Sequence, residues 1–294
     1  MNIIKTIPES KDHWLALRAG NINSTEISAL FDCNPYLSQF QIFHNKRNGV
    51  EIPFEETDRI KWGTRLQSKI AEGIAADRCW SIREMKEYIY DENLRLGSSF
   101  DYIVNEEIIM EIKNIDSLVY RNKWTEDEAP PAIELQVQQQ MLLSGKNKAV
   151  ICALVGGNEV KIIERDYNPV IGNAIIKKVK EFWLREDEPQ INYDIDSNFL
   201  KTFYQDVEQG KIIESNQAMD DLASAYQSVS EQIKELEARK EEYKLRLMSL
   251  IGNSEKVKSP FYSISCSMTQ ESRIEFVRKP FRNFRISWKK NNET

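Results

Sequence analysis

The pattern of apolar and polar residues divides residues 1–190 into helices and strands. Apolar stripes with a helical period follow capping residues such as Ser10, Ser38 and Thr57. They predict helices over residues 11–19, 26–31, 38–46, 57–78, 132–144 and 169–185. Alternation at every second position predicts strands over residues 81–90, 94–104, 108–115, 148–155 and 159–165. This order implies an α/β (α+β) fold in which helices pack on the faces of a mixed sheet.

The pattern changes after Pro189. A polar stretch at 192–198 indicates a linker, so we expect one domain over 1–190 and a C-terminal extension over 191–294. In the extension, apolar residues follow one another at alternating spacings of four and three along one long helix, 218–251. This heptad seam consists of Leu222, Tyr226, Val229, Ile233, Leu236, Tyr243, Leu247 and Leu250, with Lys240 at the missing step. The helix either docks on its own domain or pairs with a helix of another subunit or protein.

The last part of the chain is basic. Residues 261–268 and 282–288 predict a final β-hairpin. The basic residues of this tail are Arg278, Lys279, Arg282, Arg285, Lys289 and Lys290. They suit contact with a nucleic-acid backbone, or they are ordinary solvated charges.

The two strands on either side of Asn105-Glu106-Glu107 indicate an earlier hairpin. If those residues form the loop, Val104 faces Ile108 and Asp101 lies directly opposite Glu111. Cross-strand neighbours have Cβ atoms about 5 Å apart, close enough for two carboxylates to share one metal ion. A shorter loop would shift the register by one position and separate the two carboxylates.

Asp101, Glu111 and Lys113 together offer the chemistry of phosphodiester cleavage. Carboxylate oxygens favour Mg²⁺ or Mn²⁺, which keep several waters and contact substrate phosphate. Lys113 projects from the same strand face as Glu111, where it could orient the attacking water and stabilise developing charge. The alternative is an exposed strand face with ordinary solvated charges, because a D-x9-E-x-K pattern is common by itself.

Composition sets limits on the class of protein. Hydrophobic residues make up 41% and charged residues 29%, and no apolar run approaches the roughly 20 residues that span a bilayer. The N-terminus lacks the apolar core of a signal peptide, so we expect a cytoplasmic protein. The widely spaced cysteines Cys33, Cys79, Cys152 and Cys266 are expected to be small buried hydrophobes in a reducing compartment. Two histidines are too few for a histidine-based zinc site, and a net charge of −6 argues mildly against a protein that coats nucleic acid.

Glutamines stand out on two predicted helices. Gln67 lies on the apolar stripe of the long helix before the strands, where an amide must find partners or cost stability. It either reaches a site on the sheet or bonds to the backbone. On the helix after the hairpin, Gln136 and Gln140 share a face, whereas Gln138 lies elsewhere. Glutamine can orient a water or contact phosphate, although polar surface residues are the default interpretation.

Short motifs stand in a fixed order along residues 10–185. They are Trp14-Leu15-Ala16-Leu17-Arg18, Asn21-Ile22-Asn23-Ser24-Thr25-Glu26, Asn34-Pro35-Tyr36, Trp62-Gly63-Thr64-Arg65-Leu66-Gln67, Ser99-Phe100-Asp101, Glu111-Ile112-Lys113 and Gln136-Val137-Gln138-Gln139-Gln140-Met141 with Gly145. Taken together they resemble the YqaJ-type viral recombinase family, relatives of phage lambda exonuclease among the PD-(D/E)xK nucleases. The ordered set is more specific than any one motif. The heptad helix and basic tail also resemble an extension of some phage members.

The resemblance implies a restriction-endonuclease-like core with a mixed central β-sheet flanked by helices, followed by the long helix and a small hairpin. It implies that Asp101 and Glu111 bind a metal ion, with the backbone carbonyl of Ile112 as a further ligand. Lys113 would orient the nucleophile. The implied metal is Mg²⁺, with Mn²⁺ as the alternative.

Other motif residues take implied roles around this centre. Arg18 and Thr25 would hold a DNA end phosphate, a role that a cation beside a helix start can perform. Gln67 and Gln136 belong to the implied catalytic group, and Gln138 to the DNA contacts. Many relatives have glutamate at position 67, so the glutamine here puts a second metal site in doubt. Asn23-Ser24 also departs from the family's Thr-Ala.

The implied function is a Mg²⁺-dependent deoxyribonuclease of phage recombination, acting 5′→3′ on double-stranded DNA in the host cytoplasm. The resemblance also implies a homo-oligomer, for which a trimer is plausible, and a single-strand annealing protein as partner. An endonuclease of the same fold is the first alternative, because no sequence feature separates cutting at ends from internal cutting. A non-catalytic DNA-binding or assembly protein is the second. Gln67 and the acidic net charge favour it, whereas the retained carboxylates and lysine argue against it.

Overall fold

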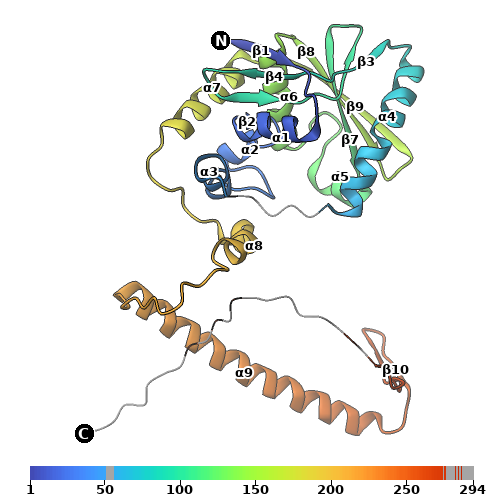
Figure 1. Ribbon diagram of the computed structural model, residues 1–294. Coiled ribbons are helices and arrows are strands. Elements are labelled where there is room, and N and C mark those ends of the chain that lie inside the picture. The colour runs from blue at the N-terminus through green and yellow to red at the C-terminus, as the bar shows by residue number, and fades with distance from the viewer. Residues whose placement is uncertain (51–55, 274, 276–281, 283, 285, 287–294) are drawn as a thin grey trace. The chain divides into compact units, whose positions relative to one another are not determined.

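The computed structural model describes residues 1–50, 56–273, 275, 282, 284 and 286 (Figure 1). Its two compact units are Met1–Tyr204 and Gln205–Thr294. The helices of the first unit are α1 Lys11–Ala19, α2 Ile27–Leu30, α3 Gln39–Asn48, α4 Asp58–Arg78, α5 Ser117–Lys123, α6 Pro131–Ser144, α7 Pro169–Leu184 and α8 Tyr193–Phe203. The side chains of Ser10, Ser38 and Thr57 accept hydrogen bonds from the first turns of α1, α3 and α4, as their sequences predicted.

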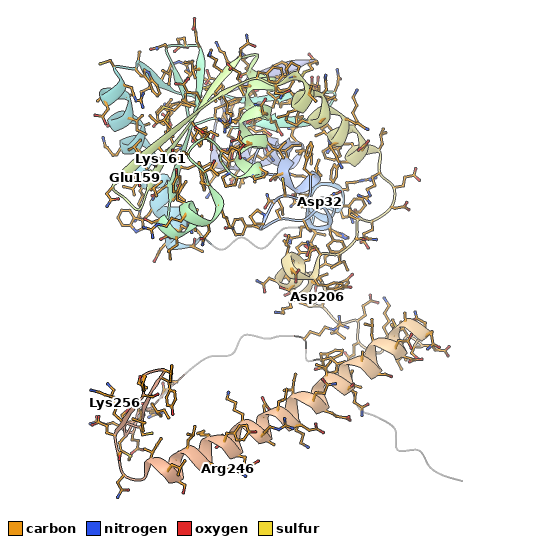
Figure 2. The ribbon with its side chains drawn as sticks, turned by 180° about the vertical axis from the view of Figure 1, so that it is seen from behind. Asp32, Glu159, Lys161, Asp206, Arg246 and Lys256 are labelled. Atoms are coloured by element: carbon orange, nitrogen blue, oxygen red, sulfur yellow. The ribbon has the colours of Figure 1, made fainter. Side chains whose placement is uncertain are left out.

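A mixed five-stranded sheet forms the centre of the first unit. Its strands, in spatial order, are β3 Ile82–Glu84, β6 Tyr102–Val104, β7 Ile108–Ile115, β8 Lys148–Val155 and β9 Glu159–Asp166. Only β7 and β8 are parallel, because α5 and α6 carry the chain back between them. Charged side chains such as Lys161 and Glu159, 2.8 Å apart, line the edge strand β9 (Figure 2). The predicted mixed sheet flanked by helices is confirmed.

A second, four-stranded sheet shows that two of the predicted strands were wrong. Its order is β1 Ile3–Thr6, β4 Tyr88–Asp91, β5 Leu96–Ser98 and β2 Ile22–Asn23. Residues 81–90 and 94–104 were each predicted as one strand, but each is divided between the two sheets. In residues 94–104, apolar side chains stand at even positions on both sides of the break, so periodicity alone could not locate the point where the chain changes sheet. Ser99-Phe100-Asp101 lies at one of these crossings.

Helices α4 and α6 cover the two faces of the five-stranded sheet (Figure 1). Met110 and Ile112 of β7 pack in one apolar cluster with Ile70 of α4. Ile109 of the same strand packs in the other cluster with Val137 of α6. Successive strand residues point to opposite faces, so the odd-numbered residues of β7 face α6. Glu111 and Lys113 are therefore directed toward the glutamine-rich helix.

Helix α8 lies where a linker was predicted, and that prediction is wrong. Phe199 of α8 stacks on Phe203 and packs edge-on against Phe40 of α3. The buried Asp196 accepts hydrogen bonds from Ser38 Oγ (2.5 Å) and Gln41 Nε2 (2.8 Å), at the start of α3. Polar residues at 192–198 looked solvated in sequence, but a charge near a helix N-terminus is stabilised there. The first unit consequently extends to Tyr204.

In the second unit, α9 Gln217–Ile251 forms over almost the predicted range. None of its residues, all of which the structure describes, is buried. The seam members are between 43% exposed at Leu247 and 84% at Leu250. No element described within this unit buries the seam.

The small hairpin of the second unit differs from the predicted one. Strand β10 Lys256–Lys258 pairs antiparallel with β11 Ser263–Ser265. Only β11 overlaps the predicted 261–268 strand, and its partner precedes it in sequence. In the predicted 282–288 strand, the described residues 282, 284 and 286 form no strand, and the others lie outside the described residues. Arg278, Lys279, Arg285, Lys289 and Lys290 of the basic tail lie outside them too.

The structure also tests what composition predicted about the cysteines and about membrane-spanning helices. All four cysteines are free, but only Cys152 is buried, so the prediction of four buried cysteines is wrong. Cys79 ends α4 and Cys266 follows β11, both at the surface. Within the described residues, every helix is too short or too polar to cross a bilayer.

Candidate active site

The hairpin between β6 and β7 has the predicted register. Val104 pairs with Ile108 across a loop of Asn105, Glu106 and Glu107. The first two loop residues adopt positive φ values of 51° and 59°, which allow the tight reversal. This register directs Asp101, the residue before β6, toward the segment of β7 that carries Glu111.

Backbone hydrogen bonds hold Asp101 at the sheet crossing. Its carboxylate Oδ2 accepts from the backbone N–H of Ile112 at 2.8 Å. Its own carbonyl accepts from the N–H of Met85 at 3.0 Å. The aspartate is thereby attached to β7 and to the β3–β4 connection, which fixes the carboxylate beside the strand.

Glu111 lies at the centre of a buried polar cluster. Its Oε1 accepts from Lys113 Nζ at 2.5 Å and from Gln136 Nε2 at 2.7 Å. Gln136 Oε1 in turn accepts from Lys113 Nζ at 3.1 Å. Glu111 is 3% exposed, so these charge-assisted bonds compensate for lost hydration of its carboxylate. The structure brings together Asp101, Glu111, Lys113 and Gln136.

Gln140 is a member of this cluster to which sequence analysis assigned no role. Its Nε2 donates to Glu111 Oε2 at 2.8 Å and to the carbonyl of Ser99 at 3.2 Å. It thus connects the Ser99–Asp101 segment to Glu111. The sequence contained one signal: Gln136 and Gln140 are four residues apart and share a helix face.

Gln138 requires a correction. Its Nε2 donates to the carbonyl of Asp166 at 3.0 Å, and its Oε1 accepts from the N–H of Asn168 at 2.8 Å. Both ends of this buried amide bind the turn between β9 and α7. Because Gln138 points about 200° around the helix from Gln136, it does not join the cluster. We therefore withdraw its assignment to the DNA contacts.

The electrostatics of the site are those of two adjacent carboxylates with one cation. Burial, followed by the charge of Glu111, raises the pKa of Asp101 from 3.8 to about 7. Burial would lower the pKa of Lys113, but Glu111 and Asp101 together raise it, so the ammonium stays protonated. Gln67 hydrogen-bonds to Asp101, which slightly opposes the rise. Of the two interpretations of Gln67, contact with the site is the one that the structure supports.

The residues present fit a hard divalent cation. Two carboxylates with like charge lie close together, and carboxylate oxygens are the ligands that Mg²⁺ takes. Gln140 Oε1 is buried and has no hydrogen-bond partner among the described residues. It could therefore accept a hydrogen bond from a water molecule of a hydrated ion. The described part of the chain contains no group of three or more acidic, histidine or cysteine side chains that could hold a metal ion. The donor set is therefore small.

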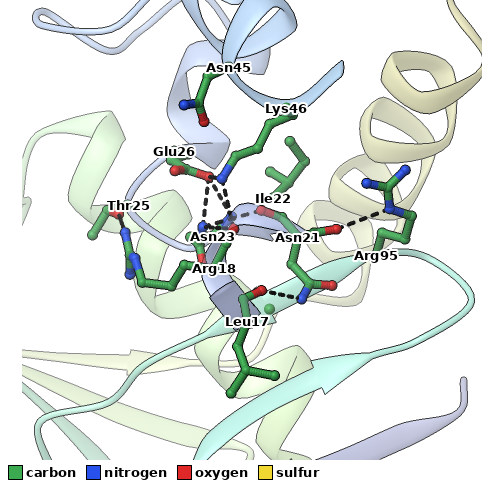
Figure 3. A network of polar contacts seen from close by, with 12 residues as sticks. Leu17, Arg18, Asn21, Ile22, Asn23, Thr25, Glu26, Asn45, Lys46 and Arg95 are labelled. Atoms are coloured by element: carbon green, nitrogen blue, oxygen red, sulfur yellow. Dashed lines mark hydrogen bonds and ion pairs between the residues drawn. The ribbon is translucent and has the colours of Figure 1, made fainter. Parts of the chain in front are cut away.

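Arg18 and Thr25 come together beside this centre. Arg18 Nη2 donates to Thr25 Oγ1 at 3.3 Å (Figure 3). The guanidinium lies 4.7 Å from the ring centroid of Trp14. Trp14 Nε1 in turn donates to Ser99 Oγ at 2.9 Å. Trp14 thus connects the Arg18 guanidinium to the Ser99–Asp101 segment.

Comparison with known proteins gives this arrangement a context. The model of the YqaJ-like viral recombinase domain matches residues 13–147. A Bacillus subtilis (strain 168) relative named "Uncharacterized protein YqaJ" is 26% identical over 251 residues, which are 82% of this chain and 78% of that protein.

Solved structures share the fold. The alkaline exonuclease LHK-Exo from Laribacter hongkongensis superposes with a TM-score of 0.50 at 14% identity, over 66% of this chain and 97% of that one. Its complex with dAMP has the same TM-score at 15% identity and the same coverage. Residues 13–147 of this chain thus match the YqaJ-like viral recombinase domain, and the fold is similar to that of LHK-Exo.

Proposed function

We propose that the chain is a metal-dependent deoxyribonuclease, acting as a 5′→3′ exonuclease on double-stranded DNA. The observation that carries the proposal is the convergence of Asp101, Glu111 and Lys113 in one half-buried cluster. A structural role alone does not explain it, because burying Asp101 near the charge of Glu111 disfavours its ionised form and costs stability.

Each residue has a role that its contacts support. Asp101 and Glu111, with the backbone carbonyl of Ile112, would hold Mg²⁺ or Mn²⁺. The bound ion would supply Lewis-acid stabilisation of the phosphate and lower the pKa of an attacking water. Lys113 stays protonated, so it orients the water and stabilises negative charge rather than accepting a proton. Gln136 and Gln140 hold Glu111 in place.

The neutral side chain of Gln67 supports one metal ion rather than two. It contacts Asp101 but brings no charge, and a second divalent ion would need further carboxylates. Gln67 can instead hold a water or hydrogen-bond to Asp101.

Arg18 and Thr25 support action at DNA ends. A guanidinium and a hydroxyl 3.3 Å apart can both bind one phosphate group. LHK-Exo, which has a similar fold, binds dAMP, a nucleotide with a terminal phosphate. A terminal phosphate held here would distinguish an end from internal DNA. Homo-oligomerisation, for example as a trimer, and a single-strand annealing partner remain predictions from the resemblance.

The test uses Glu111→Ala and Lys113→Ala with a matched control, Lys161→Ala, which removes a half-buried lysine of an ion pair on β9. With Mg²⁺, the wild type and the control should digest linear DNA with a 5′ phosphate faster than the dephosphorylated form, and closed circles should persist. Both site variants should lose at least about 100-fold in rate, the usual effect of removing a group that stabilises the transition state. Activity retained in either variant would contradict the site, and prompt cutting of circles would indicate an endonuclease.

A further inference from the structure

A buried ion pair lies directly behind Arg18 and Thr25. Lys46 of α3 and Glu26, the residue before α2, approach to 3.0 Å between Nζ and Oε2. Their side chains are only 3% and 15% exposed. Charged side chains are almost never buried to this extent unless they are paired.

The pair hydrogen-bonds to the backbone of the two segments that carry Arg18 and Thr25 (Figure 3). Lys46 Nζ donates to the carbonyl of Arg18 at 2.8 Å. Glu26 Oε2 accepts from the backbone N–H and from the side-chain amide of Asn23, each at 2.9 Å. The Asn23 amide also donates to the Arg18 carbonyl at 3.0 Å. Arg18 at the end of α1 and Thr25 before α2 are thus attached to one network.

Stability alone gives little reason for such a pair. Replacing a buried ion pair by apolar residues is often neutral or favourable, because removing two charges from water is costly. What the pair supplies here is fixed geometry: it adds buried, charge-assisted bonds to the few hydrogen bonds that join the end of α1 to residues 23–25. A site that is ordered before binding loses less free energy when it captures its ligand.

We propose that Lys46 and Glu26 are positioning residues that hold Arg18 and Thr25 in the geometry for a terminal DNA phosphate. This inference rests on the proposed function. Lys46 and Glu26 do not touch the phosphate; Arg18 and Thr25 do. The phosphate-binding geometry therefore depends on a charge pair that lies beneath the surface.

The test measures binding, so it does not depend on catalysis. Anisotropy with EDTA gives the Kd of a 5′-phosphorylated duplex and of the same duplex with a 5′ hydroxyl. The variants are Lys46→Met, Glu26→Gln and the double variant, and Lys177→Met is the matched control in an exposed pair of α7. Because misplacing a group by about 1 Å can cost up to about 100-fold, we expect the preference for phosphate to fall about tenfold or more.

Affinity of the folded protein for the 5′-hydroxyl duplex should change little. Each single variant should lower the thermal midpoint, because it leaves one charge buried without its partner, and the double variant should be no worse than either single one. An unchanged phosphate preference in Glu26→Gln or Lys46→Met would overturn the inference. So would a parallel loss of affinity for both duplexes, which is the result of general unfolding. If Lys46→Met does not fold, the nearly isosteric Glu26→Gln decides. A wild type that prefers phosphate in binding but digests nothing would refute the nuclease and leave this inference standing.

Discussion

Replacing Asp101 by asparagine should stabilise the metal-free protein at alkaline pH, although it removes a residue of the proposed site. Burial and the charge of Glu111 raise the pKa of Asp101 from 3.8 to about 7. At about 1.36 kcal/mol per pKa unit, ionising this group in the fold costs about 4 kcal/mol. Asp101 is partly exposed, so we discount this figure and expect Asp101→Asn to gain about 2 kcal/mol near pH 8.

The gain should depend on pH with a definite sign. The protonated Asp101 stabilises the fold, and this contribution is fully present below the unfolded pKa of 3.8. It is lost as the pH rises through about 7, the pKa in the fold. Asparagine does not titrate and can still accept from the N–H of Ile112, so its advantage is largest above pH 7 and shrinks toward acid.

Urea unfolding with EDTA, followed by tryptophan fluorescence, measures this effect. Five of the six tryptophans, all except Trp288, lie in the first unit, so the signal reports on the unit that contains the site. The control is Asp77→Asn, an exposed carboxylate, for which we expect a change within about 0.5 kcal/mol. Equal or lower stability of Asp101→Asn at pH 8, or a gain that grows toward acidic pH, would refute the reasoning.

Two further predictions concern the glutamines and the long helix. Gln140→Ala should lower the rate of DNA digestion about tenfold or more, because Glu111 loses a buried hydrogen-bond donor. Gln138→Ala should lower the free energy of unfolding but leave the rate per folded molecule unchanged. Equal rate losses in the two variants would contradict the assignment of Gln140 to the site. Leu236→Lys should change the free energy of unfolding by less than about 0.5 kcal/mol, because Leu236 is 59% exposed in the structure. A larger loss in urea unfolding would mean that the seam is covered in solution.

Local signals in the sequence determined most of the helices and one hairpin. Ser10, Ser38 and Thr57 cap helices where they were predicted to, because capping depends on residues within one turn. The register of β6 and β7 followed from loop length and alternation, so the approach of Asp101 to Glu111 was predictable. The pattern of Lys113 beside Glu111 on one strand face was local in the same way.

Only the tertiary structure decided which sheet each strand joins and which polar side chains meet. Residues 94–104 carry apolar side chains at most even positions, yet they enter two sheets, because pairing depends on strands far away in sequence. Asp196 appeared solvated until α8 packed on α3. The sequence places Gln138 and Gln140 on different faces of one helix, but only the packing shows that Gln138 binds a turn and Gln140 binds Glu111. The buried pair of Lys46 and Glu26 could not be inferred either, because it joins segments whose packing no local pattern encodes.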